Sequence, residues 1–418
     1  MKTVGIIAEY NPFHNGHAYQ IAEAKRITGA DYAVVVMSGN FVQRGTPAVW
    51  DKYTRTRAAL LGGADLVFEI PVVYATASAE YFAEGGVALL TALGVDTLCF
   101  GSECGDINVL MKIAKLFTNE SPEFKATLTK CLHEGKSFPL AREEALKAHC
   151  ATHDLSIPND LLSNPNNLLG IEYCKAILTQ NSKLTPYTIR RVGASYHDSS
   201  VSTGSYSSAT ALRALLADSV SDSSELLSAL QSQVPTEVFP AYQENRNVLP
   251  LITADDFSTL LSYRLLYETV ESLCTYADWN LELANRVLSL PNPAASFEQI
   301  AAALKSKQLT LTRVNRMLLH VLLQITTDCL QSAREQGSAF YARLLGLRES
   351  SSTALRHLGT VSSVPVINKL APAQKELQGI SADCLQLDIR ASELYRVIQQ
   401  AKGAAPSANE YTRGIIRI

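Results

Sequence analysis

Short apolar runs alternate with helical patterns along the first hundred residues. The apolar runs span residues 3–8, 32–37, 66–70 and 97–101, and helical patterns cover 16–26, 52–61 and 78–93 between them. Continuous apolar runs of this length are typical of parallel strands that helices bury on both faces. The alternation predicts an α/β fold with a doubly wound, Rossmann-like parallel sheet, and residues 186–192 add a further predicted strand.

From about residue 217 the pattern changes to helices joined by serine-rich connectors such as 218–224. We therefore predict an α/β domain over 1–217 and a mainly helical domain over 218–418. In segment 311–325 the apolar residues recur at helical spacing, while Arg313, Arg316 and His320 fall on another face. That face would suit an RNA backbone, although a solvated surface or internal ion pairs explains the spacing at least as well.

Composition narrows the class of protein. The chain has 418 residues and a formal net charge of −3, so a broad basic surface is not expected, although a local RNA-binding patch is compatible with it. Its eight cysteines form no Cys-x-x-Cys pair, which argues against a zinc ribbon or a disulfide framework. The N-terminal apolar run ends at Glu9, too early for a signal peptide, and no run approaches membrane-spanning length. We expect a cytoplasmic protein with no membrane partner.

Candidate chemistry follows the ends of the predicted strands, where doubly wound sheets bind ligands. His14-Asn15-Gly16-His17 comes soon after the first strand and opens a helix. Two imidazoles beside the free N–H groups of a helix N-terminus can hold the α-phosphate of a nucleotide, and Gly16 allows a close approach. Two histidines near a helix start are more often surface or capping groups, but the position after the first strand favours nucleotide binding.

Charged residues follow the second strand as well. Gln43-Arg44-Gly45 lies in a polar loop, and the next helix carries Lys52, Arg55 and Arg57. A solvated helix face and a substrate-binding surface are equally compatible with each charge alone. Their position beyond a strand end favours substrate binding.

Three later segments offer groups for a triphosphate or a nucleoside. Asn166 precedes a helical run, so it is either a helix cap or a group that reads a purine edge or ribose. Arg190 and Arg191 end the strand predicted over 186–192. Ser207-Ser208-Ala209-Thr210 places hydroxyls at a helix start, with Arg213 one turn later. Serine-rich helix starts are common, so this last signal is weak alone.

Longer strings carry a specific resemblance. They lie at residues 9–17, 37–45, 100–103, 165–170 and 195–198, and in the C-terminal half at 310–316 and 387–391. Together they resemble the bacterial tRNA(Met) cytidine acetate ligase family, within the His-x-Gly-His nucleotidyltransferase superfamily. The likeness spans nearly the whole chain and implies a nucleotidyltransferase-type fold. It also implies that residues 1–217 form the ATP-binding catalytic domain and that the helical domain over 218–418 contributes to tRNA binding.

The resemblance implies an ATP-dependent ligase. Such an enzyme activates acetate as acetyl-adenylate, releases pyrophosphate and acetylates N4 of the wobble cytidine of elongator tRNA(Met), with AMP as the other product. ATP is a substrate and Mg²⁺ accompanies it, but no carboxylate cage is evident and we assign no protein ligand to the metal.

Residue roles carried over with the resemblance are expectations. His14 and His17 would be catalytic, and Ala209 stands where the superfamily often has a second hydroxyl. The expected ATP-binding residues are Ile7, Ala8, Glu9, Tyr10, Asn11, Pro12, Phe13, His14, Asn15, Gly16, His17, Ala18, Tyr19, Gln20, Gly101, Asn166, Arg190, Arg191, Thr210 and Arg213. For tRNA we expect contacts from Arg44, Lys52, Arg313 and Arg316.

Two other classes stay open. One is a nucleotidyltransferase that couples a nucleotide to a small phosphorylated metabolite. The other is a non-catalytic nucleotide- or RNA-binding protein, which the intact histidine pair disfavours. The sequence does not identify the oligomeric state, the determinants of acid or tRNA selectivity, or a general base.

Overall fold

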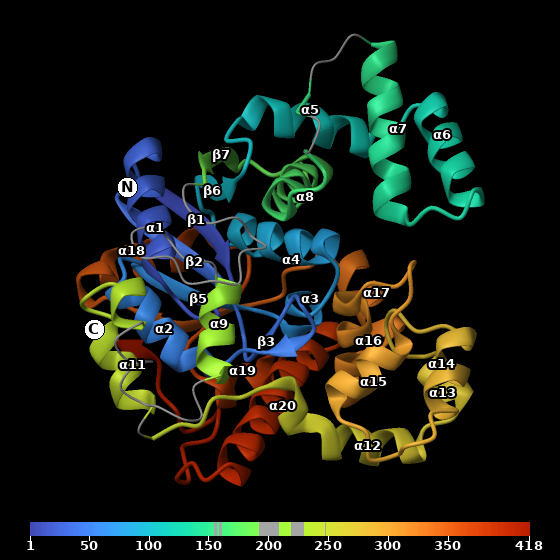
Figure 1. The fold of residues 1–418 in the computed structure, drawn as a ribbon. Coiled ribbons are helices and arrows are strands. Elements are labelled where there is room, and N and C mark those ends of the chain that lie inside the picture. Colours follow the sequence, from blue (N-terminus) through green and yellow to red (C-terminus); the bar gives the residue numbers. More distant parts are fainter. Residues whose placement is uncertain (154–156, 159–160, 192–208, 219–229, 247) are drawn as a thin grey trace.

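A mostly parallel sheet forms the centre of the protein (Figure 1). The computed structural model describes residues 1–418 apart from 154–156, 159–160, 192–208, 219–229 and 247. In the described part, the strand order is β10-β8-β5-β2-β1-β6-β7, with β9 pairing β8 beside β10, and every pairing is parallel except β5 with β8. The strands are β1 (Thr3–Ala8), β2 (Tyr32–Ser38), β5 (Leu66–Ile70), β6 (Thr97–Ser102), β7 (Thr185–Arg190), β8 (Ala342–Leu347), β9 (Val366–Ile367) and β10 (Ile416–Arg417).

The elements of the N-terminal half lie where the hydrophobic pattern predicts them. The helices are α1 (Asn15–Thr28), α2 (Lys52–Leu61), α3 (Val72–Ala75), α4 (Ala79–Ala92), α5 (Ile107–Thr118), α6 (Pro122–His133), α7 (Phe138–Thr152), α8 (Pro165–Thr179) and α9 (Ala209–Asp218). Side chains just before two of these helices fix their starts, because Asp51 accepts the N–H of Thr54 and Ser78 that of Tyr81. The prediction of a doubly wound α/β sheet is confirmed.

Helices cover both faces of the sheet, as continuous apolar strands require. On one face, Val4, Ile6 and Val35 pack with α1, α2 and α11 (Phe239–Arg246). On the other face, Val34, Val36 and Phe68 join α3, α4 and the C-terminal helices. The carboxyl ends of β1, β2 and β6 therefore open at one edge of a rigid two-sided core.

The C-terminal half supplies a helical block and then returns to the sheet. The block contains η1 (Ala254–Phe257), α12 (Ser258–Tyr267), α13 (Val270–Leu273), α14 (Leu281–Leu288), α15 (Phe297–Leu304), α16 (Leu311–Leu323) and α17 (Thr327–Glu335). After β8 come η2 (Glu349–Ser351), α18 (Ser352–Val361), α19 (Leu370–Glu376) and the long α20 (Ile380–Ala401).

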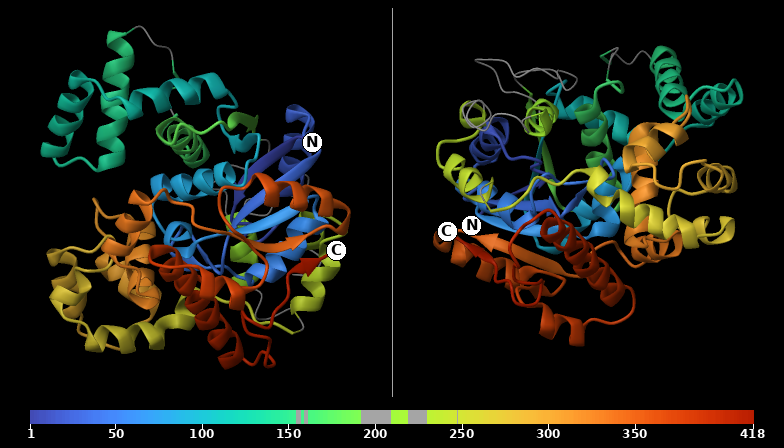
Figure 2. Two further views of the ribbon diagram at one scale, coloured as in Figure 1. Left: turned by 180° about the vertical axis from the view of Figure 1, so that it is seen from behind. Right: turned by 60° about the horizontal axis from the view of Figure 1, so that its bottom comes forward.

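Figure 2 shows the orange and red C-terminal segments against the blue N-terminal strands, and β8 pairs directly with β5. The two halves of the chain thus share one sheet. The prediction of a mainly helical second half did not include these C-terminal strands. The division at residue 217 stays a prediction.

A small hairpin ties the loop after β2 to the helical block. It consists of β3 (Phe41–Val42) and β4 (Thr46–Pro47), and its turn passes through Gly45 with φ of +75°. A Cβ at Gly45 would stand 2.2 Å from the backbone nitrogen of Arg316 in α16, so only glycine fits this approach. The pairing of β3 with β4 and the close packing of Gly45 against α16 therefore hold the loop that carries Gln43 and Arg44.

Candidate active site

A cavity of about 350 Å³ opens at the carboxyl ends of β1 and β6, the place expected for a ligand in a doubly wound sheet. Its lining brings together residues that lie far apart in the sequence. They are Ile7, Ala8, Glu9, Tyr10, Asn11, His14, His17, Gln20, Gln43, Arg44, Ala79, Phe82, Phe100, Gly101, Pro165, Asn166, Leu168, Leu169, Tyr173, Arg191, Ala209, Thr210 and Arg213.

His14 and His17 are fixed by the start of α1. Nδ1 of His14 accepts the N–H of Gly16 at 3.1 Å, and Nδ1 of His17 accepts the N–H of His14 at 3.3 Å. The two rings stack with centroids 3.8 Å apart. Because each Nδ1 is an acceptor, a neutral ring carries its proton on Nε2, which leaves an N–H donor on each histidine for an anion.

Both histidines are neutral at physiological pH. Burial, followed by the charges of Arg191 and Arg213, lowers the pKa of His14 to about 3. Burial and the neighbouring His14 and Arg191 lower the pKa of His17 well below its ordinary value. The pair can therefore offer N–H dipoles to a ligand, and the positive charge of the site comes from arginines.

The loop between β1 and α1 is braced from distant parts of the chain. Tyr10 has φ of 49°, an unusual conformation for a non-glycine residue, and its buried ring makes edge contacts with Phe13 and His17. Tyr242 of α11 accepts the N–H of Phe13 at 2.9 Å, and Arg55 donates to the carbonyl of Glu9 at 2.6 Å. This packing fixes the ring of His17 beside the cavity.

The roles of Tyr242 and Arg55 were not found from the sequence. Tyr242 lies 229 residues from the loop it supports, and no local signal marks it. Arg55 is fully buried and also donates to the carbonyls of Ser38 and Trp50, so it binds backbone and not substrate.

Arg213 and Thr210 reach the cavity from the start of α9. Arg213 donates to the carbonyl of Asn11 at 2.8 Å and to Oγ1 of Thr210 at 3.1 Å. Burial and the nearby Arg44 lower the pKa of Arg213 to about 10, which keeps it charged at neutral pH. One side of the cavity thus offers the guanidinium groups of Arg213 and Arg44 and the hydroxyl of Thr210, a donor set suited to phosphate oxygens.

Gly101 near the end of β6 and Asn166 in the first turn of α8 also line the cavity. A Cβ at Gly101 would stand 3.3 Å from Cγ of Arg191, so the side chain of Arg191 packs closely over the glycine. Asn166 follows the first residue of α8, and Glu103 binds its side chain at 2.6 Å and the N–H of Asn167 at 2.8 Å. Asn166 is thus held by Glu103 and lines the cavity, while the helix cap is Asn164.

Other expected ATP-binding residues lie outside the lining of this cavity. They are Pro12, Phe13, Asn15, Gly16, Ala18, Tyr19 and Arg190. Phe13 is fully buried under the loop, and Arg190 is exposed at the end of β7, where its Cβ packs against Gly105. Ser207, Ser208 and the string 195–198 lie outside the described residues.

Lys52 is wrongly predicted as a tRNA contact, because its side chain is 0% exposed. Its Nζ lies 2.8 Å from Glu69, 2.8 Å from Glu410 and 2.8 Å from Oγ of Ser392. Arg343 of β8 completes the cluster by pairing with both glutamates. Four buried charges balance here, as burial of a charge requires.

The basic face predicted on α16 is also largely wrong. Arg316 is buried near Asp278, and His320 is buried between the carbonyls of Ala277 and Thr76. Arg313 alone of this group has a well exposed side chain, at 45%, with Nε 3.7 Å from Asp278. Contact of Arg313 and Arg44 with tRNA stays a prediction.

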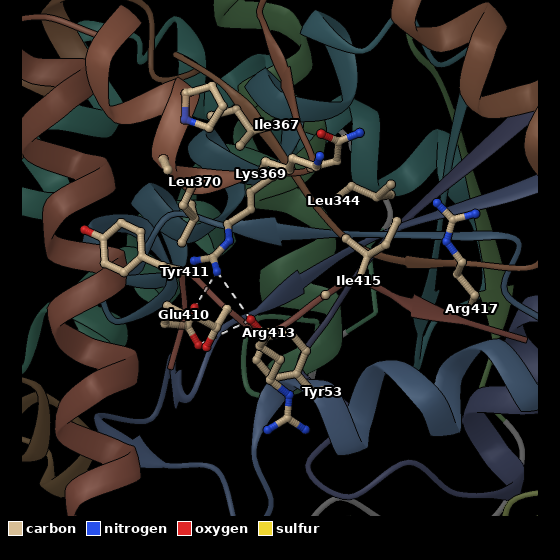
Figure 3. Close-up of a pocket in the computed structure, with 16 residues that line it drawn as sticks. Tyr53, Leu344, Ile367, Lys369, Leu370, Glu410, Tyr411, Arg413, Ile415 and Arg417 are labelled. Carbon is tan, nitrogen blue, oxygen red and sulfur yellow. Dashed lines mark hydrogen bonds and ion pairs between the residues drawn. The ribbon is translucent and has the colours of Figure 1, made fainter. Parts of the chain in front are cut away.

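A second cavity, of about 420 Å³, lies beside the buried charge cluster (Figure 3). Its lining includes Tyr53 and Glu410 and the basic residues Lys369, Arg413 and Arg417. The guanidinium of Arg413 stacks over the ring of Tyr53 at 4.3 Å. This cavity lies on the β8 side of the sheet and contains none of the residues of the histidine motif.

Neither a metal-binding cluster nor a membrane-spanning helix is found in the part of the chain that the structure describes. No group of three or more His, Cys, Asp or Glu residues there is placed to hold a metal ion. None of the described helices is long and apolar enough to cross a membrane.

A doubly wound sheet with two neutral histidines, a helix N-terminus and arginines around one cavity defines a nucleotidyltransferase-type protein. The HIGH Nucleotidyl Transferase family model matches residues 1–410. The tRNA(Met) cytidine acetate ligase of Acetivibrio thermocellus is 38% identical over 418 residues, covering 100% of both chains. That of Caldicellulosiruptor saccharolyticus is 40% identical over 400 residues and 94% of each chain.

Solved structures agree with these relatives. Thermotoga maritima TmcAL bound with alpha-thio ATP superposes with a TM-score of 0.89 at 27% identity, covering 100% of both chains. Its apo form gives a TM-score of 0.91 at 28% identity over the same coverage. This chain belongs to the tRNA(Met) cytidine acetate ligase family of HIGH nucleotidyltransferases.

Proposed function

We propose that this protein activates acetate with ATP and transfers the acetyl group to N4 of the wobble cytidine of elongator tRNA(Met). The observation that carries the proposal is the pair of Nε2–H donors on His14 and His17 beside Arg213 in one cavity. The names of the relatives supply the substrates.

In the first step a carboxylate oxygen of acetate attacks the α-phosphorus of ATP, and pyrophosphate leaves. The two histidine N–H groups suit the α-phosphate oxygens, on which charge develops during displacement. Arg213, Thr210 and the start of α9 suit the departing pyrophosphate. Gly101, Asn166 and Arg191 would hold the adenosine side.

The second step joins the acetyl group to the tRNA base. Adenylation gives the acetyl carbon a good leaving group, so the protein mainly has to position N4 and exclude water. An anticodon base is single-stranded and can enter a pocket by stacking and edge contacts. Arg44 at the cavity and Arg313 on the surface are the basic residues proposed to meet the RNA.

Mg²⁺ would enter with ATP, coordinated by the phosphates and water, which is the usual state of this ion. The reaction would take place in the cytoplasm, where the tRNA is found.

The first step is tested by acetate-dependent exchange of labelled pyrophosphate into ATP. We expect exchange with acetate and little without it. Exchange that ignores acetate but responds to a small phosphorylated metabolite would contradict the proposal and favour the alternative nucleotidyltransferase.

A further inference from the structure

Glu9 places a carboxylate in the lining of the cavity. Among the described residues of its lining it is the only acidic one. It follows β1 directly, and its carbonyl is held by Arg55, so the backbone that carries it is fixed. Oε1 of Glu9 accepts the N–H of Gln43 at 2.9 Å, which orients the carboxylate.

Glu9 is surrounded by residues from three helices. Arg213 of α9, Arg55 of α2 and Tyr173 of α8 all lie close enough to interact electrostatically with it. Arg44 lines the same cavity. Within the part of the chain that the structure describes, no hydrogen bond is found to Oε2 of Glu9.

The second reaction step needs an acceptor for a proton, since N4 of cytosine must lose one when it becomes an amide. His14 and His17 are poor candidates, because a backbone N–H already occupies the free lone pair of each ring at Nδ1. A carboxylate oxygen is the strongest remaining acceptor in the described lining.

We propose that Glu9 is the catalytic residue that accepts the N4 proton of cytidine during acetyl transfer, an inference that rests on the proposed function. N4 attacks the carbonyl carbon of acetyl-adenylate and a C–N bond forms. The bond from that carbon to the phosphate oxygen breaks, AMP leaves with the electron pair, and the proton passes from N4 to Oε2 of Glu9.

The same contact discriminates between bases. A carboxylate accepts a hydrogen bond from the N4 amino group of cytosine. Uracil presents an oxygen at that position, which the carboxylate would repel. Glu9 therefore couples base recognition to the step that needs the proton acceptor.

The test is Glu9→Gln, which keeps an oxygen for the N–H of Gln43 but lacks a basic carboxylate. Two readouts separate the steps: acetate-dependent pyrophosphate exchange, and single-turnover transfer from preformed acetyl-adenylate to tRNA. We expect transfer to fall by about 10²-fold or more and exchange to fall far less.

Two controls accompany it. Glu23→Gln removes a carboxylate from α1 outside the cavity and should leave both readouts at the wild-type level. Glu9→Asp keeps a carboxylate and should transfer faster than Glu9→Gln. If Glu9→Gln does not fold, Glu9→Asp carries the test, with a loss confined to transfer expected.

Transfer at the wild-type rate in a folded Glu9→Gln protein would overturn the inference. An equal loss of exchange and transfer would also overturn it, because the carboxylate would then serve the ATP step. Failure of the proposed function is a different result, namely no acetate-dependent exchange in the wild-type protein.

Discussion

Replacing Lys52 with methionine should destabilise the protein strongly. Lys52 and Arg343 balance Glu69 and Glu410 in a buried cluster, so Lys52→Met leaves one negative charge without compensation. Although burial alone raises the pKa of Glu410, Lys52 and Arg343 lower it to about 2, which shows how closely the charges are coupled. Breaking a buried pair by removing one partner costs about 3–5 kcal/mol.

That cost is a large part of the roughly 5–15 kcal/mol that stabilises a typical domain. The assay is guanidinium unfolding followed by circular dichroism at neutral pH. Arg57→Met is the matched control, because its pair with Glu244 is exposed by 41% and 62% and should contribute no more than about 1 kcal/mol. Lys52→Met/Glu69→Gln should regain part of the loss by restoring charge balance. A loss below about 1 kcal/mol for Lys52→Met would refute the reasoning.

Three further predictions concern the site and the surface. His17→Ala should fold but lose about 10²–10³-fold of acetate-dependent AMP formation, since it removes an N–H donor to the phosphate; wild-type turnover in a folded variant would reject this role. The stability of the wild type should fall by about 2 kcal/mol between about pH 6.5 and pH 5 through His14, because the unfolded chain binds a proton there that the folded site, with its pKa of about 3, does not. His14→Gln should lose the part of that slope that comes from His14, while His17, whose pKa is also lowered, keeps its own part; an unchanged slope in unfolding experiments would contradict the assignment. Arg313→Glu should weaken tRNA binding and its salt dependence but spare adenylate formation, and unchanged affinity would remove Arg313 from the RNA surface.

Local signals were sufficient to predict the core of the fold. The strand predicted over 66–70 is β5, Leu66–Ile70, and the helix predicted over 52–61 is α2, Lys52–Leu61. These elements follow from burial on both faces and from caps one residue before a helix, which are properties of adjacent residues. The histidine motif was found for the same reason, because His14 and His17 lie three residues apart at one helix start.

Long-range pairing was not predictable in this way. β8 joins the sheet next to β5 although more than 270 residues separate them, and its apolar residues resemble those of the helices around it. Lys52 was predicted to meet substrate because it follows a strand end, and Arg316 because it shares a helix face with Arg313. Their partners Glu410 and Asp278 nevertheless come from distant segments. A charge is placed inside or outside by partners that only the fold brings near.

The central claim is that this protein acetylates a cytidine of tRNA with acetate as the donor. The most direct measurement incubates it with ATP, Mg²⁺, isotope-labelled acetate and unmodified elongator tRNA(Met), followed by nuclease digestion and mass spectrometry. The account predicts labelled N4-acetylcytidine at the wobble position and an equal amount of AMP. A folded, ATP-binding preparation that forms none of it would contradict the account.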